Sequence, residues 1–340
     1  MSFEQRVTEA IQPIRFHVLA IGIYHLINEG IYDKLLESPQ SLESLTLELN
    51  LDKAKSEGFF KYLANEDILT FSEEKIELTP KGLQINEARG HYIYMVGGYN
   101  PTYRQIGEKL RKGSGWATRD SRQVGVGTCQ ISYYDAIPMT KKLIAHMEQK
   151  SNFVLDIGCG SALYLVELCK LSPELKAWGM EKDYGGYQAA IQLVEKEGLS
   201  DRIKVSNTSA LDSLQSPFEE EPNLAIVNYV LQEVLMQDGE EAVVEFLTGI
   251  VKRFPNIYIV VIEIDMQIEN KDIMSHDFAL ASYNPYYLVH YFTEQKLQTK
   301  EYWENMFERC NLEIVAQDTT DVEVDSTGLE IGYLLRAIKK

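Results

Sequence analysis

The sequence predicts an α/β protein in which a doubly wound parallel sheet follows a mostly helical N-terminal domain. Two observations predict this fold class. Before about residue 150, apolar residues recur at helical spacing, as between Ile14 and Leu26, whereas beyond it short apolar runs alternate with helical segments. A chain of 340 residues also exceeds what one hydrophobic core usually organises, so two domains are expected.

Charge and cysteine content narrow the possible partners. The chain carries 33 basic and 51 acidic residues, a net charge of −18, which repels phosphate backbones and anionic lipid surfaces. The four cysteines show no CxxC spacing, the first residues lack the plan of a signal peptide, and no uninterrupted apolar run approaches membrane-spanning length. We therefore expect a cytoplasmic protein that binds neither nucleic acid nor membrane.

Residues 1–90 are expected to form a winged-helix-like domain. Residues 41–82 indicate helix, turn, helix and a two-stranded wing, with Asp52 as the cap of the second helix. That helix carries balanced charges, which disfavours a DNA reader although the pattern alone permits one. The apolar stripe from Val18 to Ile27 needs a partner surface, so a homodimer-forming domain is the preferred interpretation.

Residues 91–150 are expected to be linker helices that contribute to a substrate site. The segment is rich in glycine, tyrosine and arginine, and a forked guanidinium can hold a carboxylate by two parallel hydrogen bonds. Arg119 is the candidate clamp with Arg122 in reserve, and Tyr133 and Tyr134 are candidate walls of the site. A plain interdomain helix with surface arginines is the alternative.

A strand and a glycine turn open the domain of residues 151–340. Phe153–Ile157 is too short an apolar run for a helix, and Gly158-Cys159-Gly160 follows it before a helical segment begins at Ala162. In an open α/β sheet, a turn between a strand's carboxyl end and a helix's amino end is where nucleotide-like ligands bind.

A second acidic residue indicates which ligand. Glu181 ends the next expected strand, 25 residues after Asp156, where a carboxylate can accept both hydroxyls of a ribose. The turn lacks the third glycine of dinucleotide binders, and Asp156 before it would repel a pyrophosphate but suits the cationic S-adenosylmethionine (SAM). Three further SAM neighbours follow later strands: Ser209, Ala210 and Asn228.

Further strands are expected at 203–205, 224–227, 257–264, 313–316 and 332–337, the last two paired. With the glycine turn and Glu181, this arrangement resembles the class I SAM-dependent methyltransferases over residues 150–340. The resemblance implies a Rossmann-like, SAM-binding sheet and by itself names no substrate.

A narrower resemblance covers nearly the whole chain. VNYVLQEVLMQDGEEAVVEFL, IEIDMQIEN, SYNPYYLVHYFTEQKL and DSTGLEIGYLLRA, with KLRKGSGWATRD upstream, are similar to C-methyltransferases that act at carbon 3 of 2-oxo acids, such as the 2-ketoarginine and phenylpyruvate enzymes. The resemblance implies an arginine that binds the substrate carboxylate and a divalent or ferric metal ion held by histidines. His290 and His276 are the candidate ligands.

One position departs from this pattern, because relatives of this kind carry His-Glu or His-Asp where this chain has Gln232-Glu233. A glutamine can bind a metal only through its neutral carbonyl oxygen, a poorer donor than imidazole. The metal could therefore be absent, more weakly bound, or held instead by His276, Asp277, His290 and Glu233.

The candidate catalytic residues are Gln232, Glu233, His290 and Arg119, and Tyr283 of SYNPYY is a further substrate contact. Glu233 is the expected base, because a partly desolvated carboxylate can be tuned upward toward neutral pH. Its alternative role is a helix-capping or surface residue. His290 could instead be a core histidine, and His276 a helix cap.

Two other functions stay open at this stage. The domain could methylate an oxygen or nitrogen of a small phenol or amine without a metal. It could also bind SAM without turning it over, as a regulatory module whose winged helix touches DNA. Incubation with labelled SAM and pooled 2-oxo acids, phenols and amines distinguishes the three.

Overall fold

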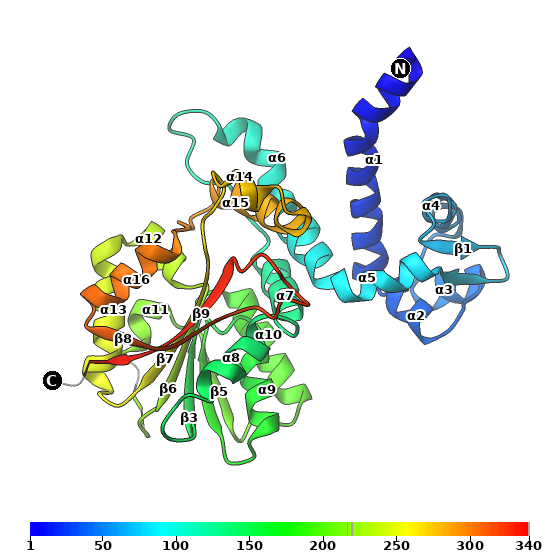
Figure 1. Cartoon of the computed structure of the whole chain (residues 1–340). Helices are drawn as coiled ribbons and strands as arrows, with labels where there is room; N and C mark the ends of the chain where they lie inside the picture. The colour runs from blue at the N-terminus through cyan, green and yellow to red at the C-terminus, as the bar shows by residue number, and fades with distance from the viewer. Residues whose placement is uncertain (216, 219, 339–340) are drawn as a thin grey trace. The chain divides into compact units, whose positions relative to one another are not determined.

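The computed structural model describes residues 1–215, 217–218 and 220–338, and the chain divides into two compact units, Met1–Gly98 and Tyr99–Lys340 (Figure 1). The boundary lies eight residues beyond the expected one at residue 90. Most of the segment expected to be a separate linker, residues 91–150, therefore belongs to the second unit.

The first unit is mainly helical. Its elements are α1 (Phe3–Asn28), α2 (Ile31–Glu37), α3 (Leu42–Glu48), α4 (Lys53–Asn65), β1 (Leu69–Phe71), β2 (Ile76–Leu78), α5 (Pro80–His91) and the π-helical η1 (Tyr92–Gly98). Asp52 caps α4 as expected, since its Oδ1 accepts from the Lys55 amide at 2.9 Å. The strands β1 and β2 pair antiparallel, so the expected order of helix, helix and two-stranded hairpin is present.

The long helix α1 is only partly covered by its own unit. Ile23 and Leu26 are buried, whereas Ile14 and Val18 are 64% and 45% exposed. By length and composition α1 could cross a membrane. The sequence did not predict this, because it contains no uninterrupted apolar run of that length. Only 22% of the apolar window of α1 is buried. One such helix is weak evidence for a span, because helices of soluble cores pass the same test.

The second unit contains a seven-stranded sheet of order β5-β4-β3-β6-β7-β9-β8, in which β9 runs antiparallel to both of its neighbours, β7 and β8, and the other strands run in one direction. Every strand expected from the apolar runs is present, as β3 (Phe153–Ile157), β4 (Lys176–Met180), β5 (Ile203–Ser206), β6 (Leu224–Asn228), β7 (Tyr258–Ile264), β8 (Leu312–Thr319) and β9 (Glu330–Ala337). The order reverses beside β3, which is the topological switch point of a doubly wound sheet.

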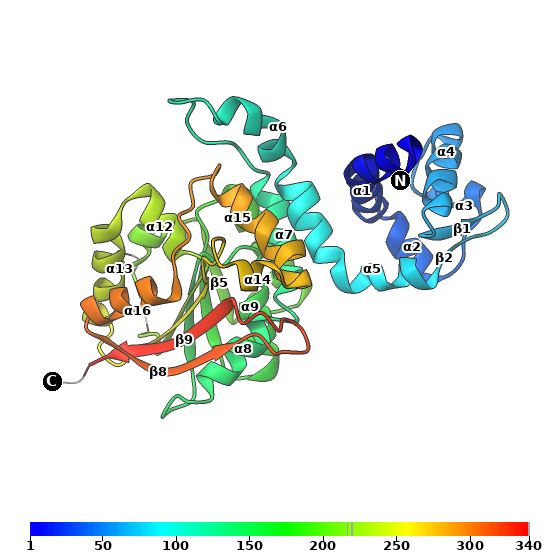
Figure 2. The same ribbon diagram turned by 45° about the horizontal axis from the view of Figure 1, so that its top comes forward.

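Helices cover both faces of this sheet, as Figure 2 shows with α13 and α16 on one side and α8 and α9 on the other. The helical segments of the unit are α6 (Asn100–Lys109), α7 (Ser121–Ile131), α8 (Ala136–Ile144), α9 (Leu163–Leu171), α10 (Tyr184–Lys196), α11 (Ala210–Ser213), α12 (Leu231–Gln237), α13 (Glu240–Arg253), α14 (Lys271–Met274), η2 (Ala279–Tyr283), α15 (Asn284–His290) and α16 (Lys300–Arg309).

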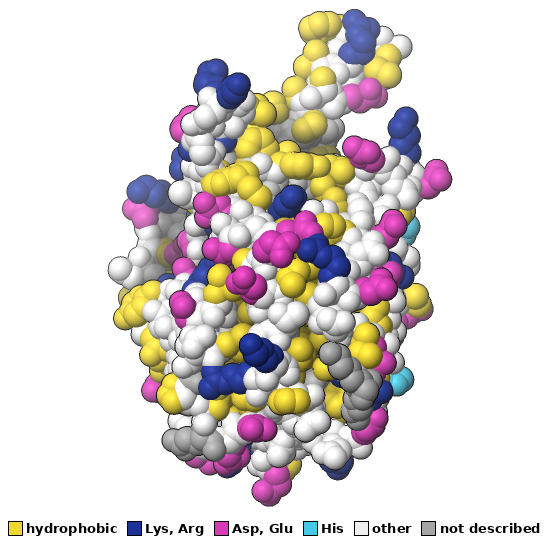
Figure 3. Space-filling model, turned by 90° about the vertical axis from the view of Figure 1, so that its left-hand side faces the viewer, with side chains coloured by type: hydrophobic (Ala, Val, Ile, Leu, Met, Phe, Trp, Pro, Cys, Tyr) yellow, Lys and Arg dark blue, Asp and Glu magenta, His cyan; other side chains and the backbone are white. Residues whose placement is uncertain are grey.

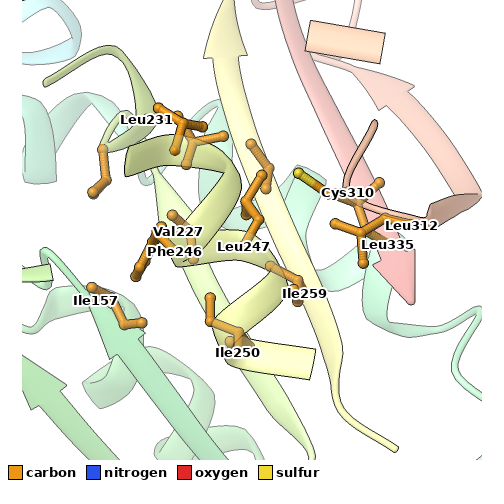
Figure 4. Packing of buried hydrophobic residues seen from close by; sticks show 14 of the residues in the cluster. Ile157, Val227, Leu231, Phe246, Leu247, Ile250, Ile259, Cys310, Leu312 and Leu335 are labelled. Atoms are coloured by element: carbon orange, nitrogen blue, oxygen red, sulfur yellow. The ribbon is translucent and has the colours of Figure 1, made fainter. Parts of the chain in front are cut away.

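The core lies in two apolar layers, one on each face of the sheet. Figure 4 shows Phe246 and Leu247 of α13 packed against Val227 and Ile259 of the sheet. Each such side chain contributes about 1.5–3 kcal/mol when fully buried. This packing fixes the carboxyl ends of β3, β4, β6 and β7 along one edge of the sheet, where the polar residues of the next section lie.

Candidate active site

The turn after β3 requires its glycines. Gly158 and Gly160 have φ angles of 82° and 53°, in the left-handed region that side chains disfavour. A Cβ on Gly158 would lie only 2.5 Å from Cγ2 of Val230. The Gly158 amide donates to the carbonyl of Met180 at 2.7 Å, which fastens the turn to the end of β4. The backbone is thus exposed for close approach by a ligand.

Asp156 and Glu181 flank this turn as the spacing predicted. Glu181 Oε2 accepts from the Gly160 amide at 2.9 Å, and Oε1 accepts from the Asp183 amide at 2.8 Å. Asp156 is buried, and its Oδ2 has no hydrogen-bond partner within the described part of the chain. Burial, together with the charge of Glu181, raises the pKa of Asp156 to about 8. A ligand cation would satisfy this oxygen and stabilise the charged form.

The other expected SAM neighbours have mixed environments. Asn228 is the last residue of β6, and neither amide atom of its side chain has a hydrogen-bond partner among the described residues. Ser209 instead caps α11, because its Oγ accepts from the Asp212 amide at 3.1 Å. Ala210 is the first residue of that helix. The Ser209 hydroxyl is therefore already occupied, whereas Asn228 has unmet hydrogen-bonding capacity.

Glu233 of α12 is the centre of a polar network. Its Oε1 accepts from Arg119 Nη2 at 2.6 Å and from Gln295 Nε2 at 3.4 Å, and its Oε2 lies 3.0 Å from Lys182 Nζ. The hydroxyl of Tyr99 donates to Gln295 Oε1 at 3.2 Å. Arg119, chosen from sequence as a carboxylate clamp, and Glu233, chosen as a base, are therefore ion-paired partners.

This network reverses the expected tuning of Glu233. Burial raises its pKa, but the positive charges of Arg119 and Lys182 outweigh burial, so the pKa lies below the ordinary value. The carboxylate is therefore ionised at neutral pH, and both of its oxygens face cations. A carboxylate held in this way is a weaker base than the sequence led us to expect.

A second group joins Gln232, Tyr286 and His290. The imidazole of His290 lies over the Tyr286 ring with centroids 4.0 Å apart, and its Nδ1 is 2.7 Å from the Tyr286 carbonyl oxygen. Since a carbonyl only accepts, Nδ1 carries the proton and Nε2 keeps its lone pair. Gln232 Nε2 donates to the Tyr286 hydroxyl and to the Tyr229 carbonyl, both at 3.4 Å.

Two acceptor atoms of this group are unpaired. Gln232 and His290 are buried, and neither Gln232 Oε1 nor His290 Nε2 has a partner within residues 1–215, 217–218 and 220–338. Burial, together with the charge of Arg119, lowers the pKa of His290 to about 3, so its imidazole is neutral near pH 7. Such unmet capacity is costly in a closed core and is common where a ligand binds.

Glu263 of β7 supports the helix that carries these side chains. Its Oε1 accepts from the Leu231 amide at 3.1 Å, at the start of α12. Burial raises its pKa to about 8, and the nearby charge of Glu233 acts in the same direction. The carboxyl therefore holds its proton near neutral pH and fixes the position of Gln232 and Glu233.

Several expected residues lie outside these groups. Tyr133 and Tyr134 are 46% and 49% exposed, so they do not form buried walls of the site. Arg122 is exposed, and its Cβ faces Gly185 of α10. Tyr283 is buried, and its hydroxyl donates to Asp325 Oδ2 at 2.5 Å. Of these four residues, only Tyr283 meets a polar partner in the interior.

The two candidate metal-binding histidines have different environments. Nδ1 of the exposed His276 accepts from the Phe278 amide at 3.2 Å, and its Nε2 lies 3.1 Å from Ser326 Oγ, so both nitrogens are engaged. No three His, Cys, Asp or Glu side chains in the described part of the chain group closely enough to hold a metal ion. His290 therefore lacks the protein partners that a metal centre requires.

The sequence did not predict five residues of the site: Tyr99, Lys182, Glu263, Tyr286 and Gln295. Lys182 directly follows Glu181, and Glu263 lies near the end of a buried strand, so their strand-end positions offered a signal. Tyr286 lies four residues before His290, on the same helical face. Gln295 follows the helix in an irregular segment and carried no signal.

The fold and the comparisons with known proteins define a SAM-dependent methyltransferase. Human N-acetylserotonin methyltransferase in complex with SAM aligns over 100% of this chain and 99% of its own with a TM-score of 0.67 and 12% identity. N,N-8-Amino-8-demethyl-D-riboflavin dimethyltransferase of Streptomyces davawensis aligns over 99% and 100% with a TM-score of 0.64 and 14% identity. At such identities, these likenesses show the fold.

The particular family follows from sequence. The chain is 37% identical over 337 residues to the 2-ketoarginine methyltransferase of Streptomyces arginensis, across 98% of this chain and 96% of that protein. The protein belongs to the 2-ketoarginine methyltransferase family. No family model matches the chain. The resemblance expected from the YNPYYLVH and DSTGLEIGYLLRA segments is thereby confirmed.

Proposed function

We propose that this enzyme transfers the methyl group of SAM to carbon 3 of a 2-oxo acid whose side chain carries a positive charge. The observation that carries the proposal is the 37% identity to a 2-ketoarginine methyltransferase over 98% of this chain. That substrate combines a carboxylate, a ketone and a guanidinium group. The site offers suitable chemistry for each of these groups.

Arg119 is suited to the carboxylate. Its side chain is 23% exposed, so ligand can reach it, and the ion pair with Glu233 fixes one edge of the guanidinium fork. A planar fork held in this way can still donate to a substrate carboxylate through its remaining N–H groups. Lys182, which binds the other oxygen of Glu233, adds positive charge to the same region.

His290 is suited to the proton transfer. Its free Nε2 lone pair accepts the proton from carbon 3, the C–H electron pair forms the C2–C3 double bond, and the ketone oxygen takes the negative charge. Carbon 3 then takes the methyl group supplied by the sulfonium of SAM, and the electron pair of the broken bond stays on sulfur. A bound substrate carboxylate raises the pKa of His290 by its charge and so makes it a better base.

Two buried carboxylates support a cationic side chain on the substrate. Asp325 and Glu330 accept from hydroxyl groups, namely Tyr283 for the first and Tyr229 and Thr320 for the second. No lysine, arginine or histidine forms an ion pair with either one in the portion of the chain that the structure describes. Burial raises the pKa of Glu330 well above its ordinary value, and a guanidinium bound beside it would stabilise the charged form.

The proposed assembly is a cytoplasmic homodimer that binds neither nucleic acid nor membrane. The exposed apolar side chains of α1 support a second copy as their partner. On the face shown in Figure 3, basic and acidic side chains are interspersed, without the continuous basic patch that a phosphate backbone favours.

The deciding experiment incubates purified protein and SAM with 2-ketoarginine, phenylpyruvate, a phenol and an amine in parallel. We expect 2-ketoarginine to gain one methyl group at carbon 3, located by NMR, faster than phenylpyruvate. Methylation of only the phenol or the amine would replace the proposal with O- or N-methylation. SAM binding without any turnover would favour a regulatory role.

A further inference from the structure

The donor set beside Gln232 does not fit the metal ion that the family resemblance implies. A catalytic metal usually takes three protein ligands, of which imidazole and carboxylate are the strong ones. Among the described residues beside Gln232, His290 is a strong donor with a free lone pair, and Gln232 itself offers a neutral carbonyl oxygen. Glu233 faces two cations, and burial keeps Glu263 protonated.

The charged side chains near Gln232 also disfavour a metal ion. Arg119 and Lys182 both lie within 3.0 Å of Glu233, so together these three side chains carry one net positive charge beside the unpaired atoms. The charge of Arg119 is close enough to lower the pKa of His290. A divalent or trivalent cation placed here would be repelled by the same charge. An anionic substrate would instead be attracted.

We propose that this enzyme binds the ketone oxygen of its substrate through the Gln232 carboxamide, and that no metal ion takes part. The proposal rests on the proposed C-methylation of a 2-oxo acid and names how this site stabilises the enolate. Gln232 occupies the position at which relatives of this kind carry histidine.

The contacts of Gln232 permit this role. Both hydrogen bonds of its amide nitrogen are long, 3.4 Å each, so little is lost when the carboxamide rotates by half a turn. The nitrogen then points to where the unpaired oxygen lay, and the oxygen can accept from the Tyr286 hydroxyl, while the long hydrogen bond to the Tyr229 carbonyl is given up. An N–H group turned toward the substrate donates to the ketone oxygen and stabilises the charge that develops there.

Formation of the enolate requires no reactant other than the substrate and the side chains of the protein. The proton leaves carbon 3 for Nε2 of His290, and the negative charge forms on the oxygen that Gln232 contacts. Arg119 contributes positive charge nearby, so the enolate is stabilised by two groups of the protein itself. Exchange of the carbon 3 proton with solvent therefore reports this half-reaction without methyl transfer.

The test measures metal content and proton exchange on the same protein. Full-length enzyme purified without chelator is analysed for transition metals by mass spectrometry, and deuterium uptake at carbon 3 of 2-ketoarginine is followed by NMR in D₂O before and after chelator dialysis. We expect far less than one metal ion per chain and an exchange rate that the chelator does not change. Gln232→Leu should slow exchange strongly with the affinity for SAM retained.

A converse variant makes the result decisive. Gln232→His adds a second imidazole beside His290, so this variant should bind added Zn²⁺ more tightly than the wild type, while His276→Gln should leave metal content and exchange as in the wild type. Stoichiometric metal in the wild type, with exchange lost after dialysis, would overturn this inference and leave the proposed function standing. Absence of exchange and methylation for every 2-oxo acid, with or without added metal, would instead overturn the proposed function.

Discussion

Arg119 and Glu233 meet at 2.6 Å from Nη2 to Oε1, although 114 positions separate them in the chain. Their side chains are only 23% and 18% exposed, so solvent screens the pair less than a surface salt bridge. Glu233 thereby holds the guanidinium in one orientation. The sequence assigns Arg119 as a carboxylate clamp and Glu233 as a base. Because the two side chains form an ion pair, a substitution of either residue is expected to change the orientation of the other.

The first prediction concerns the geometry of this guanidinium. Arg119→Lys keeps the positive charge but loses the planar guanidinium, which can form two parallel hydrogen bonds. The substrate carboxylate is therefore still attracted but is no longer held in one orientation. A misplacement of about 1 Å costs on the order of a hundredfold in rate. We expect kcat/KM for 2-ketoarginine to fall by about that factor while the calorimetric affinity for SAM stays within about twofold.

Arg122→Lys is the matched control for Arg119, since Arg122 is exposed and was the reserve candidate for the same role. Its kcat/KM should stay near the wild-type value. If Arg119→Lys retains activity within about twofold, the carboxylate clamp is assigned wrongly, and a loss in Arg122→Lys would transfer the role to that residue.

The second prediction concerns the cofactor. Glu181→Ala removes the carboxylate expected to accept the ribose hydroxyls and leaves the Gly160 and Asp183 amides without their acceptor. Affinity for SAM should weaken by about 1–3 kcal/mol, the usual cost of leaving such groups unpaired. Isothermal calorimetry with SAM and S-adenosylhomocysteine measures this change.

Glu195→Ala, at the exposed C-terminal end of α10, is the control for Glu181, because it removes an equal charge without touching the turn. It should bind SAM as the wild type does. If the Glu181→Ala variant binds SAM as tightly as the wild type, the ribose assignment is wrong. If both variants lose the same affinity, the loss is a general effect of charge and not of a contact with the ribose.

The sheet could be predicted from sequence because its strands are buried on both faces. All five residues of β3 and all seven of β7 are buried, and continuous apolar runs of this length indicate such strands. Gly158, Asp156 and Glu181 could be predicted for a related reason, since a strand end followed by a turn fixes where side chains lie.

The polar network could not be predicted, because its members come from distant segments. Tyr99 and Gln295, whose side chains hydrogen-bond, are 196 positions apart. The pKa of Glu233 depends on two cations supplied by other elements, so its direction follows from the folded chain alone. The exposure of Tyr133 and Tyr134 could not be predicted either, because aromatic composition does not show which face of a segment is buried.

The third prediction concerns assembly. Val18 and Ile14 expose apolar surface on α1, so a second copy of the chain should cover it. Light scattering at tens of micromolar should give about twice the 38.9 kDa of the monomer. Val18→Asp combined with Ile14→Asp should shift the protein to monomer, while Leu47→Asp on α3, which is 80% exposed, should not. A wild-type monomer at these concentrations would contradict the dimer.

The last prediction concerns pH and Glu263. Burial raises the pKa of this carboxyl from 4.5 to about 8, so the folded protein keeps a proton that the unfolded chain releases. Stability from this group is fully present below about pH 4.5 and declines as the pH rises toward 8, because the unfolded chain then binds fewer protons. Glu263→Gln mimics the protonated carboxyl and has no proton to release, so its Tm should fall less than that of the wild type between about pH 5 and about pH 8.5. Because Asp156 contributes equally to both proteins, the difference between their two Tm shifts isolates Glu263. Parallel pH profiles would mean that Glu263 is already ionised, and its hydrogen bond to the Leu231 amide would then be a charged one.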